Sequence, residues 1–204
     1  MFYSQIRQDE FIDNFFNHKS NGIFLDIGAN DGILLSNTYF FEKEKNWTGI
    51  CIEPRTEEYV KLIQNRKCYC VNSAISNCEG TKDFLEIKGH AAMLSGLSEN
   101  YDVRHLERIR SEMESGGKCD TIQIQVTRLQ TILNKFNIHN IDYCSIDVEG
   151  AELDVIKSID FGKTQIKIFT IENNYNTNEV RDYLKDYNYT LYTKLEIDDV
   201  FVKD

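Results

Sequence analysis

The stretch that decides the fold is Ile23-Phe24-Leu25-Asp26-Ile27-Gly28-Ala29-Asn30-Asp31-Gly32. Its first five residues form a short apolar run that ends in a glycine-containing loop, which is typical of a strand buried on both faces of a sheet. Helical patterns separate it from later runs of the same kind. These runs are Thr48–Glu53, Tyr69–Val71, Tyr143–Ile146 and Ile166–Ile171. Strands that alternate with helices form βαβ units, so the sequence predicts an α/β fold with a Rossmann-like, doubly wound, mostly parallel sheet.

Two segments depart from this alternation. Tyr189–Lys194 and Val200–Val202 are separated by polar residues, which predicts a C-terminal antiparallel hairpin at the sheet edge. Residues 88–119 are polar and rich in glycine, so we expect them to form a lid or insertion within a single domain that spans residues 1–204. After this segment, Thr127 with Gln130 three residues later predicts a capping box at the start of the next helix.

Composition restricts the partners and the compartment. The 204 residues include 33 Asp and Glu against 23 Lys and Arg, a formal net charge of −10, which makes nucleic acid an unlikely partner. No apolar run reaches the ~18 residues of a membrane helix, and charges occupy the first twenty residues, so we expect no membrane association. The six cysteines form no C-x-x-C pair, which favours reduced thiols in a cytoplasmic protein over a disulfide framework or a zinc site.

The loop after the first strand is where a ligand is expected, because ligands of such sheets bind at the carboxyl ends of the strands. Its glycines do not have the G-x-G-x-x-G spacing of a dinucleotide site, which disfavours NAD. Asp26 would repel a pyrophosphate but attract an ammonium or a sulfonium, and S-adenosylmethionine carries both. Glu53 ends the second strand, where a carboxylate can accept both hydroxyls of a ribose. The two acids predict S-adenosylmethionine as the cofactor.

Four motifs give the chain a family resemblance over nearly its whole length. They are Ser4-Gln5 with Gln8-Asp9, the loop Asp26–Gly32 followed by Ser36-Asn37-Thr38, the stretch Trp47–Pro54, and Ile141–Glu152, which is the most specific. In these motifs the chain resembles the FkbM-type methyltransferases, which are S-adenosylmethionine-dependent enzymes with a Rossmann-like sheet. The resemblance implies the class I methyltransferase architecture.

The resemblance also implies roles for particular residues. Gly28 and its neighbours would pack against the methionine part of the cofactor, Glu53 would hold the ribose, and Asp147 would lie below the sulfonium. Ala74 and Ile75 would border the adenine. The full set of implied cofactor-binding residues is Gln8, Asp26, Gly28, Ala29, Asn30, Gly32, Ser36, Asn37, Glu53, Pro54, Ala74, Ile75 and Asp147.

Methyl transfer to an alcohol also needs a group that takes up the hydroxyl proton. The candidates for this catalytic role are Asp147, Glu149, Glu172 and His90. Glu149 has a simpler alternative role, since an acid also favours the first turn of the helix that follows. In catechol-type O-methyltransferases similar positions bind Mg²⁺, which makes Asp147, Glu172 and Asn173 candidate metal ligands.

Within the insertion, His105 and Arg108 are candidates for contact with the acceptor, unless their helix face is simply solvated. The resemblance implies an O-methyltransferase that acts on a hydroxyl of a sugar, a glycan or a related natural product. Two alternatives stay open: a methyltransferase for RNA or its cap, and a non-catalytic interaction module that keeps the fold. The sequence leaves the acceptor and the oligomeric state undetermined.

Overall fold

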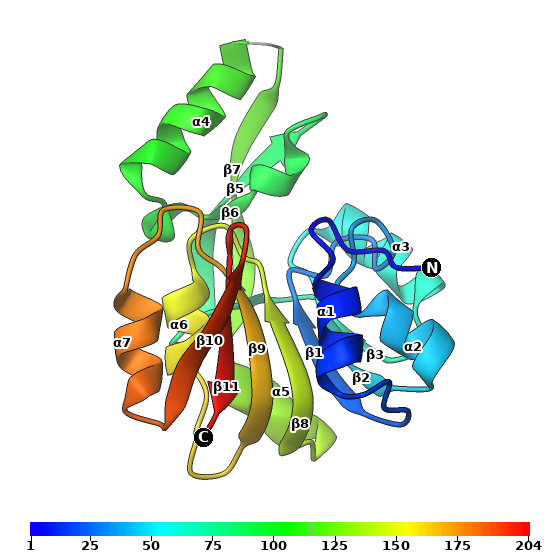
Figure 1. The fold of residues 1–204 in the computed structure, drawn as a ribbon. Coiled ribbons are helices and arrows are strands. Elements are labelled where there is room, and N and C mark those ends of the chain that lie inside the picture. Colours follow the sequence, from blue (N-terminus) through cyan, green and yellow to red (C-terminus); the bar gives the residue numbers. More distant parts are fainter. Residues whose placement is uncertain (115) are drawn as a thin grey trace.

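A seven-stranded sheet forms the centre of the computed structural model, which describes residues 1–114 and 116–204 (Figure 1). The strand order across the sheet is β3-β2-β1-β8-β9-β11-β10. The strands are β1 (Ile23–Ile27), β2 (Thr48–Ile52), β3 (Tyr69–Val71), β8 (Asn140–Ile146), β9 (Gln165–Glu172), β10 (Tyr189–Leu195) and β11 (Asp198–Lys203). All five of the strands predicted from apolar runs are present.

The winding of the sheet reverses at β1. This strand pairs in parallel with β2 on one side and with β8 on the other, and β9 continues the parallel part beyond β8. The predicted α/β, doubly wound, mostly parallel sheet is therefore confirmed. β11 lies antiparallel between β9 and β10, so the predicted C-terminal hairpin is also present, with its second strand inserted next to β9.

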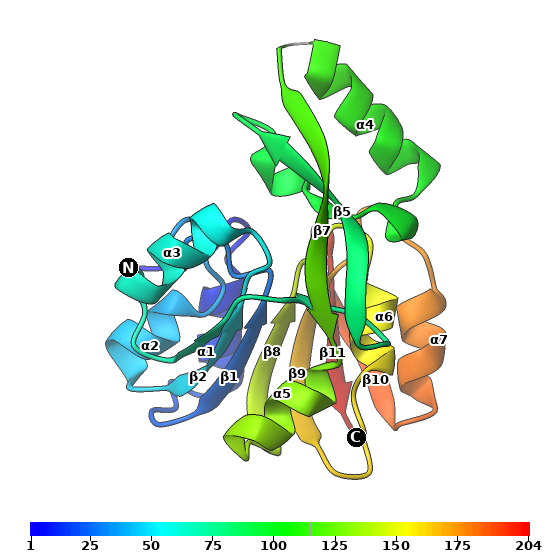
Figure 2. The same cartoon turned by 180° about the vertical axis from the view of Figure 1, so that it is seen from behind.

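Helices cover both faces of the sheet because alternate residues of β1 point to opposite faces. Phe24 packs with apolar side chains of α1 (Gln8–Phe15), α2 (Tyr39–Lys45) and α3 (Thr56–Asn65). Leu25 and Ile27 pack with those of α5 (Leu129–Phe136), α6 (Glu152–Lys157) and α7 (Glu179–Lys185). Figure 2 shows α5 lying across this second face, where β7 leads into it.

A second sheet of four strands rises beyond the carboxyl ends of the main strands (Figure 1). It consists of β4 (Ala74–Ile75), β5 (Gly80–Lys88), β6 (Gly96–Leu97) and β7 (Lys118–Thr127). β5 and β7 form a long antiparallel hairpin, and α4 (Val103–Glu114) packs at its outer end. The described part of residues 88–119, which we expected to be an insertion, connects β5 to β7 within this hairpin lobe and includes β6 and α4. The two long strands that carry the lobe were not predicted.

The capping box predicted at α5 is wrong. Thr127 is the last residue of β7, and Arg128 precedes the helix without a side-chain cap. The Gln130 side chain instead accepts hydrogen bonds from Asp160 N at 3.0 Å and from Thr164 Oγ1 at 3.1 Å. Among the described residues, the structure contains no helix with the length and apolarity needed to cross a membrane.

A buried guanidinium joins the loop after β1 to the end of α3. The Arg66 side chain has no exposed surface, and it donates to Gly32 O at 3.1 Å, Thr38 Oγ1 at 3.0 Å and Glu42 Oε2 at 3.0 Å. Its Nη1 also lies 3.9 Å from Asp26 Oδ2. The guanidinium therefore compensates the buried carboxylate of Asp26 and the partly buried carboxylate of Glu42, and it satisfies a loop carbonyl.

Replacing Arg66 with Met should lower the free energy of unfolding by about 3 to 5 kcal/mol, because Asp26 and Glu42 would lose their buried counter-charge. Urea denaturation measures this change. The matched control is Lys61→Met, since Lys61 is 56% exposed and pairs with Glu58 on the surface of α3. A loss no larger than that of the control would show that Arg66 does not hold this part of the fold together.

Candidate functional site

The strand-end cleft lies where the carboxyl ends of β1, β2 and β8 meet. At its base Gly28 adopts a φ of 91°, and a Cβ there would lie 1.8 Å from the carbonyl oxygen of Asp147. Asp147 N donates to Ile27 O at 3.0 Å, and Gly28 N donates to Ile52 O at 3.0 Å. These bonds fix three strand ends against one another, and only glycine permits the close approach.

Glu53 projects from the end of β2 into the strand-end cleft and is 3% exposed. Its Oε2 accepts from Asn30 N at 2.9 Å, while Oε1 accepts from Arg55 N at 2.9 Å and from Arg55 Nε at 3.2 Å. Burial raises the pKa of Glu53, and Arg55 opposes this shift. The carboxylate is therefore held rigidly, with lone pairs left for further donors.

The rest of the strand-end cleft has an apolar wall and a polar floor. Ala74 of β4 packs in one buried cluster with Phe84 of β5 and Leu97 of β6, and Ile75 lines the same cleft, so the hairpin lobe closes one side. The lining residues are Ile27, Gly28, Asn30, Ile52, Glu53, Pro54, Arg55, Ser73, Ala74, Ile75, Phe84, Met93, Ser95, Gly96, Leu97, Asp147, Val148, Glu149 and Ala151. This combination suits a flat heterocycle joined to a hydroxylated ring.

A smaller first-loop cavity continues from the cleft past Gly28. Its lining includes Gln8, Asp26, Ala29, Ser36 and Asn37. Asp26 accepts from Thr38 Oγ1 at 2.5 Å and from Ser36 Oγ at 3.4 Å, and burial raises its pKa while Arg66 opposes the shift. Gly32 is not among the lining residues and instead offers its carbonyl to Arg66.

An unsatisfied acceptor also lies in the first-loop cavity. Asn37 Nδ2 donates to Ser145 Oγ at 2.8 Å, but Asn37 Oδ1 is buried and has no hydrogen-bond partner among the described residues. A buried amide oxygen without a donor is costly, so a ligand donor such as an ammonium would satisfy it.

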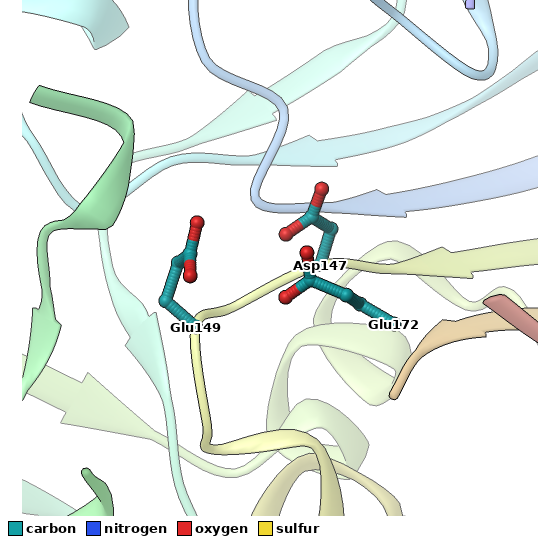
Figure 3. Close-up of side chains that lie close together, drawn as sticks. All are labelled: Asp147, Glu149 and Glu172. Atoms are coloured by element: carbon teal, nitrogen blue, oxygen red, sulfur yellow. The ribbon is translucent and has the colours of Figure 1, made fainter. Parts of the chain in front are cut away.

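The carboxyl cluster of Asp147, Glu149 and Glu172 lies beside the strand-end cleft. One oxygen of each residue lies within 4.8 Å of the others, and the three side chains converge from the ends of β8 and β9 (Figure 3). Burial raises the pKa of all three. The charge of Asp147 raises the pKa of Glu149 and of Glu172 further, Arg108 opposes the shift at Glu149, and the further rise at Asp147 comes from carboxylates outside the cluster, chiefly Asp198 and Glu152. Asp147, whose pKa is raised to about 7, can therefore accept a proton near neutral pH, and as oxygen donors the three groups could hold a hard cation.

An outer cavity opens on the other side of the carboxyl cluster. Glu149 lines both this cavity and the strand-end cleft, so the cluster lies at the junction of the two spaces. Glu172 lines the outer cavity together with His105. His105 is 2% exposed, its ring stacks on Tyr101 with 4.6 Å between centroids, and its Nδ1 lies 3.6 Å from Glu149 Oε2. The structure thus brings one residue of α4 to the predicted acids.

Three of the predicted residues do not reach the carboxyl cluster. His90 is 57% exposed, its Nε2 lies 2.7 Å from Glu112 on α4, and it lines neither the strand-end cleft nor the outer cavity. Arg108 is exposed on α4 and lines neither space. The amide of Asn173 donates to Thr177 O and to Asp199 Oδ2, so Glu149 takes the third position of the predicted metal-ligand set.

Several residues of the site were not found from the sequence. Arg55 braces Glu53 and also donates to Asn30 Oδ1 at 3.1 Å, while Phe84 and Met93 come from the hairpin lobe. Arg55 directly follows Glu53-Pro54, so a basic residue beside a strand-end acid was an available signal. The alternation of apolar and polar residues over 121–126 was a signal for β7, and hence for the lobe.

The doubly wound sheet and the cleft at its point of reversal define an α/β protein of the class I methyltransferase architecture. A family model described as Methyltransferase FkbM domain matches residues 26–191. The chain therefore belongs to the FkbM methyltransferase family, a family that implies S-adenosylmethionine as the methyl donor. No curated protein matches the chain.

Solved structures share the fold at low sequence identity. A methyltransferase FkbM from Methylobacillus flagellatus KT superposes with a TM-score of 0.51 at 12% identity, over 89% of this chain and 43% of that one. The METTL16 MTase domain gives a TM-score of 0.51 at 10% identity, over 96% of this chain and 65% of that one. The chain thus spans less than half of the Methylobacillus protein.

The raised pKa values of the carboxyl cluster predict how stability depends on pH. A carboxyl that binds its proton more tightly when folded stabilises the protein fully below the pKa of the unfolded chain, about 4, and this stabilisation is lost as the pH rises. The glutamine side chain of the Glu172→Gln variant cannot ionise. This variant therefore avoids the part of the pH-dependent loss of stability that Glu172 causes in the wild type. From about pH 5 to pH 8, the free energy of unfolding of the variant should rise relative to that of the wild type by about 1 kcal/mol or more.

Denaturant unfolding across this pH range measures the difference. The exposed Glu107 of α4 provides the control variant Glu107→Gln, whose stability should follow that of the wild type at each pH. Parallel curves for Glu172→Gln and the wild type would contradict the raised pKa of Glu172.

Proposed function

We propose that the protein is an S-adenosylmethionine-dependent O-methyltransferase that methylates a hydroxyl of a sugar, a glycan or a related natural product. The observation that carries the proposal is the position of the carboxyl cluster between two spaces. The strand-end cleft offers a site for the methyl donor, the outer cavity offers one for the acceptor, and Glu149 lines both.

The residues present fit S-adenosylmethionine. The lack of a side chain at Gly28 lets the ends of β1 and β8 lie close together at the base of the cleft, and Glu53 can accept from ribose hydroxyls. The apolar wall of Ile75 and Phe84 suits an adenine. Asn37 Oδ1, which has no partner among the described residues, suits the ammonium of the methionine part. When bound, the cofactor supplies a methyl group on a positively charged sulfur.

The chain's own carboxyl groups can manage the hydroxyl proton. Asp147 lines the strand-end cleft and the first-loop cavity, and Glu172 lines the outer cavity. Because burial and the charges of neighbouring carboxylates raise the pKa of both, each of them is a stronger base when ionised than an exposed carboxylate is. A hydroxyl hydrogen-bonded to one of these oxygens loses its proton to it while its oxygen is held in place.

Charge and cysteine chemistry support the remaining parts of the proposal. The net charge of −10 disfavours the RNA or cap alternative, since phosphate binding requires clustered basic residues. All six cysteines are free thiols, including Cys51 and Cys68, whose Sγ atoms lie 3.5 Å apart. The absence of C-x-x-C pairs from the sequence supports a reducing, cytoplasmic location over a disulfide framework.

Glu53→Gln should weaken S-adenosylhomocysteine binding by about 1 to 3 kcal/mol, because an amide replaces one charged acceptor by a donor. Isothermal titration calorimetry measures the change. The control is Glu57→Gln on the exposed start of α3, which should bind with wild-type affinity. Equal affinities of the two variants would place the ribose away from Glu53.

Asp147→Asn should reduce methyl transfer by a factor of about 100 or more, since the amide cannot take up a proton. Transfer of a labelled methyl group from S-adenosylmethionine to a panel of sugars and glycans measures the rate. The same variant should still bind S-adenosylhomocysteine. Full transfer activity in Asp147→Asn would exclude an essential carboxylate at this position.

A further inference from the structure

We propose that the outer cavity recognises a positively charged acceptor, so that the methylated hydroxyl belongs to a molecule that also carries a basic amine, such as an amino sugar. This inference rests on the proposed function, because it assigns the outer cavity to the methyl acceptor. It is carried by the lining of that cavity and by two of its carboxyl groups that have no donor.

The charged residues that line the outer cavity are acidic. They are Asp102, Glu149, Glu152, Glu172, Glu179 and Asp199. No Lys or Arg is among the described residues that line it, and the one histidine is buried. Burial lowers the pKa of His105, which keeps this ring neutral at physiological pH. A phosphate or carboxylate on the acceptor would therefore find no basic side chain in this lining to pair with.

Some of these acids already have partners within the protein. Asp102 accepts from Arg104 Nε at 2.8 Å. Asp199 lies 3.1 Å from Lys194 Nζ, and Gly150 N donates to Glu152 at 3.0 Å. Basic groups thus compensate the charges of Asp102 and Asp199, and a main-chain N–H satisfies Glu152 in part, so these three acids have partners without a ligand.

Glu149 and Glu172 differ from these acids. Glu149 is 11% exposed, and its Oε2 is buried without a hydrogen-bond partner among the described residues. Its nearest basic atom is His105 Nδ1 at 3.6 Å, which exceeds a hydrogen-bond distance. The side chain of Glu172 has neither a hydrogen bond nor an ion pair within the part of the chain that the structure describes. Both carboxyls thus have free acceptor positions that face one another.

An ammonium group suits the free acceptor positions of Glu149 and Glu172 in charge and in geometry. It offers three N–H donors to carboxyl oxygens that lie within 4.8 Å of one another, and its positive charge would favour the ionised form of these carboxyl groups. The nearby guanidinium groups do not fill the role, because Arg104 stacks over the Tyr175 ring at 4.2 Å and Arg181 pairs with Asp199 at 3.8 Å. Arg108, on the exposed side of α4, lies outside the lining.

The test compares three probes on the protein loaded with S-adenosylhomocysteine: D-glucosamine, D-glucose and D-glucose 6-phosphate. They share a ring and differ in charge. NMR titration at neutral pH should give glucosamine an affinity roughly tenfold above that of glucose, with glucose 6-phosphate weaker than glucose. In Glu172→Gln the preference for glucosamine should fall to about twofold or less, while Glu107→Gln should keep it.

Equal affinities for glucosamine and glucose would overturn the proposal, as would a preference that survives in Glu172→Gln or an absence of glucosamine binding. A titration with Mg²⁺ alone tests whether the carboxyl cluster is a metal site instead. Binding of Mg²⁺ that Glu172→Gln abolishes, together with no binding of glucosamine, would assign the carboxyl cluster to a metal instead. A failure of S-adenosylhomocysteine to bind at the outset would contradict the proposed function, and that outcome is separate from the others.

Discussion

The close packing of Gly28 against the main chain of Asp147 is the constraint on which the site depends. β1 and β8 lie side by side at the point where the sheet reverses its winding, and their carboxyl ends can approach only because Gly28 has no Cβ. The bond from Asp147 N to Ile27 O then fixes the residue that carries the first acid of the cluster. The strand-end cleft, the first-loop cavity and the carboxyl cluster all border this one contact.

The central strands and their burial could be predicted because parallel strands covered on both faces must be apolar along their length. The same reasoning found Glu53 and Asp147, since residues that end such strands lie at the edge of the sheet where ligands bind. Ala74 and Ile75 came from the family resemblance, and the structure places both in the wall of the strand-end cleft. These residues take their positions from the main chain, and the main chain follows the local sequence pattern.

The residues that could not be predicted depend on contacts between distant segments. Asn173 follows β9 as expected, but its amide binds Asp199 of the inserted strand β11, a partner 26 positions away. His90 lies in the hairpin lobe as expected, yet the hairpin directs it toward Glu112 and away from the cluster. Spacing along the chain gives no information on such partners. The local capping pattern at Thr127 failed for a related reason, because pairing with β4 and β5 keeps this segment extended.

Two polar features of the site are costly for a folded protein unless a ligand binds there. Asn37 Oδ1 is buried without a donor among the described residues, and Glu149 and Glu172 lie close together without a compensating cation among their hydrogen-bond partners. Buried polar groups are normally satisfied, and exceptions concentrate at functional sites. The exceptions here lie on either side of Gly28 and Asp147, as a donor site joined to an acceptor site would require.

The central claim is that the strand-end cleft binds the S-adenosyl group, and calorimetric titration of the folded wild-type protein tests it most directly. S-adenosylmethionine and S-adenosylhomocysteine should each bind with micromolar affinity and a stoichiometry of one per chain, and NAD should not bind. Binding of NAD in place of the S-adenosyl ligands, or binding of none of them by a protein shown to be folded, would contradict the account.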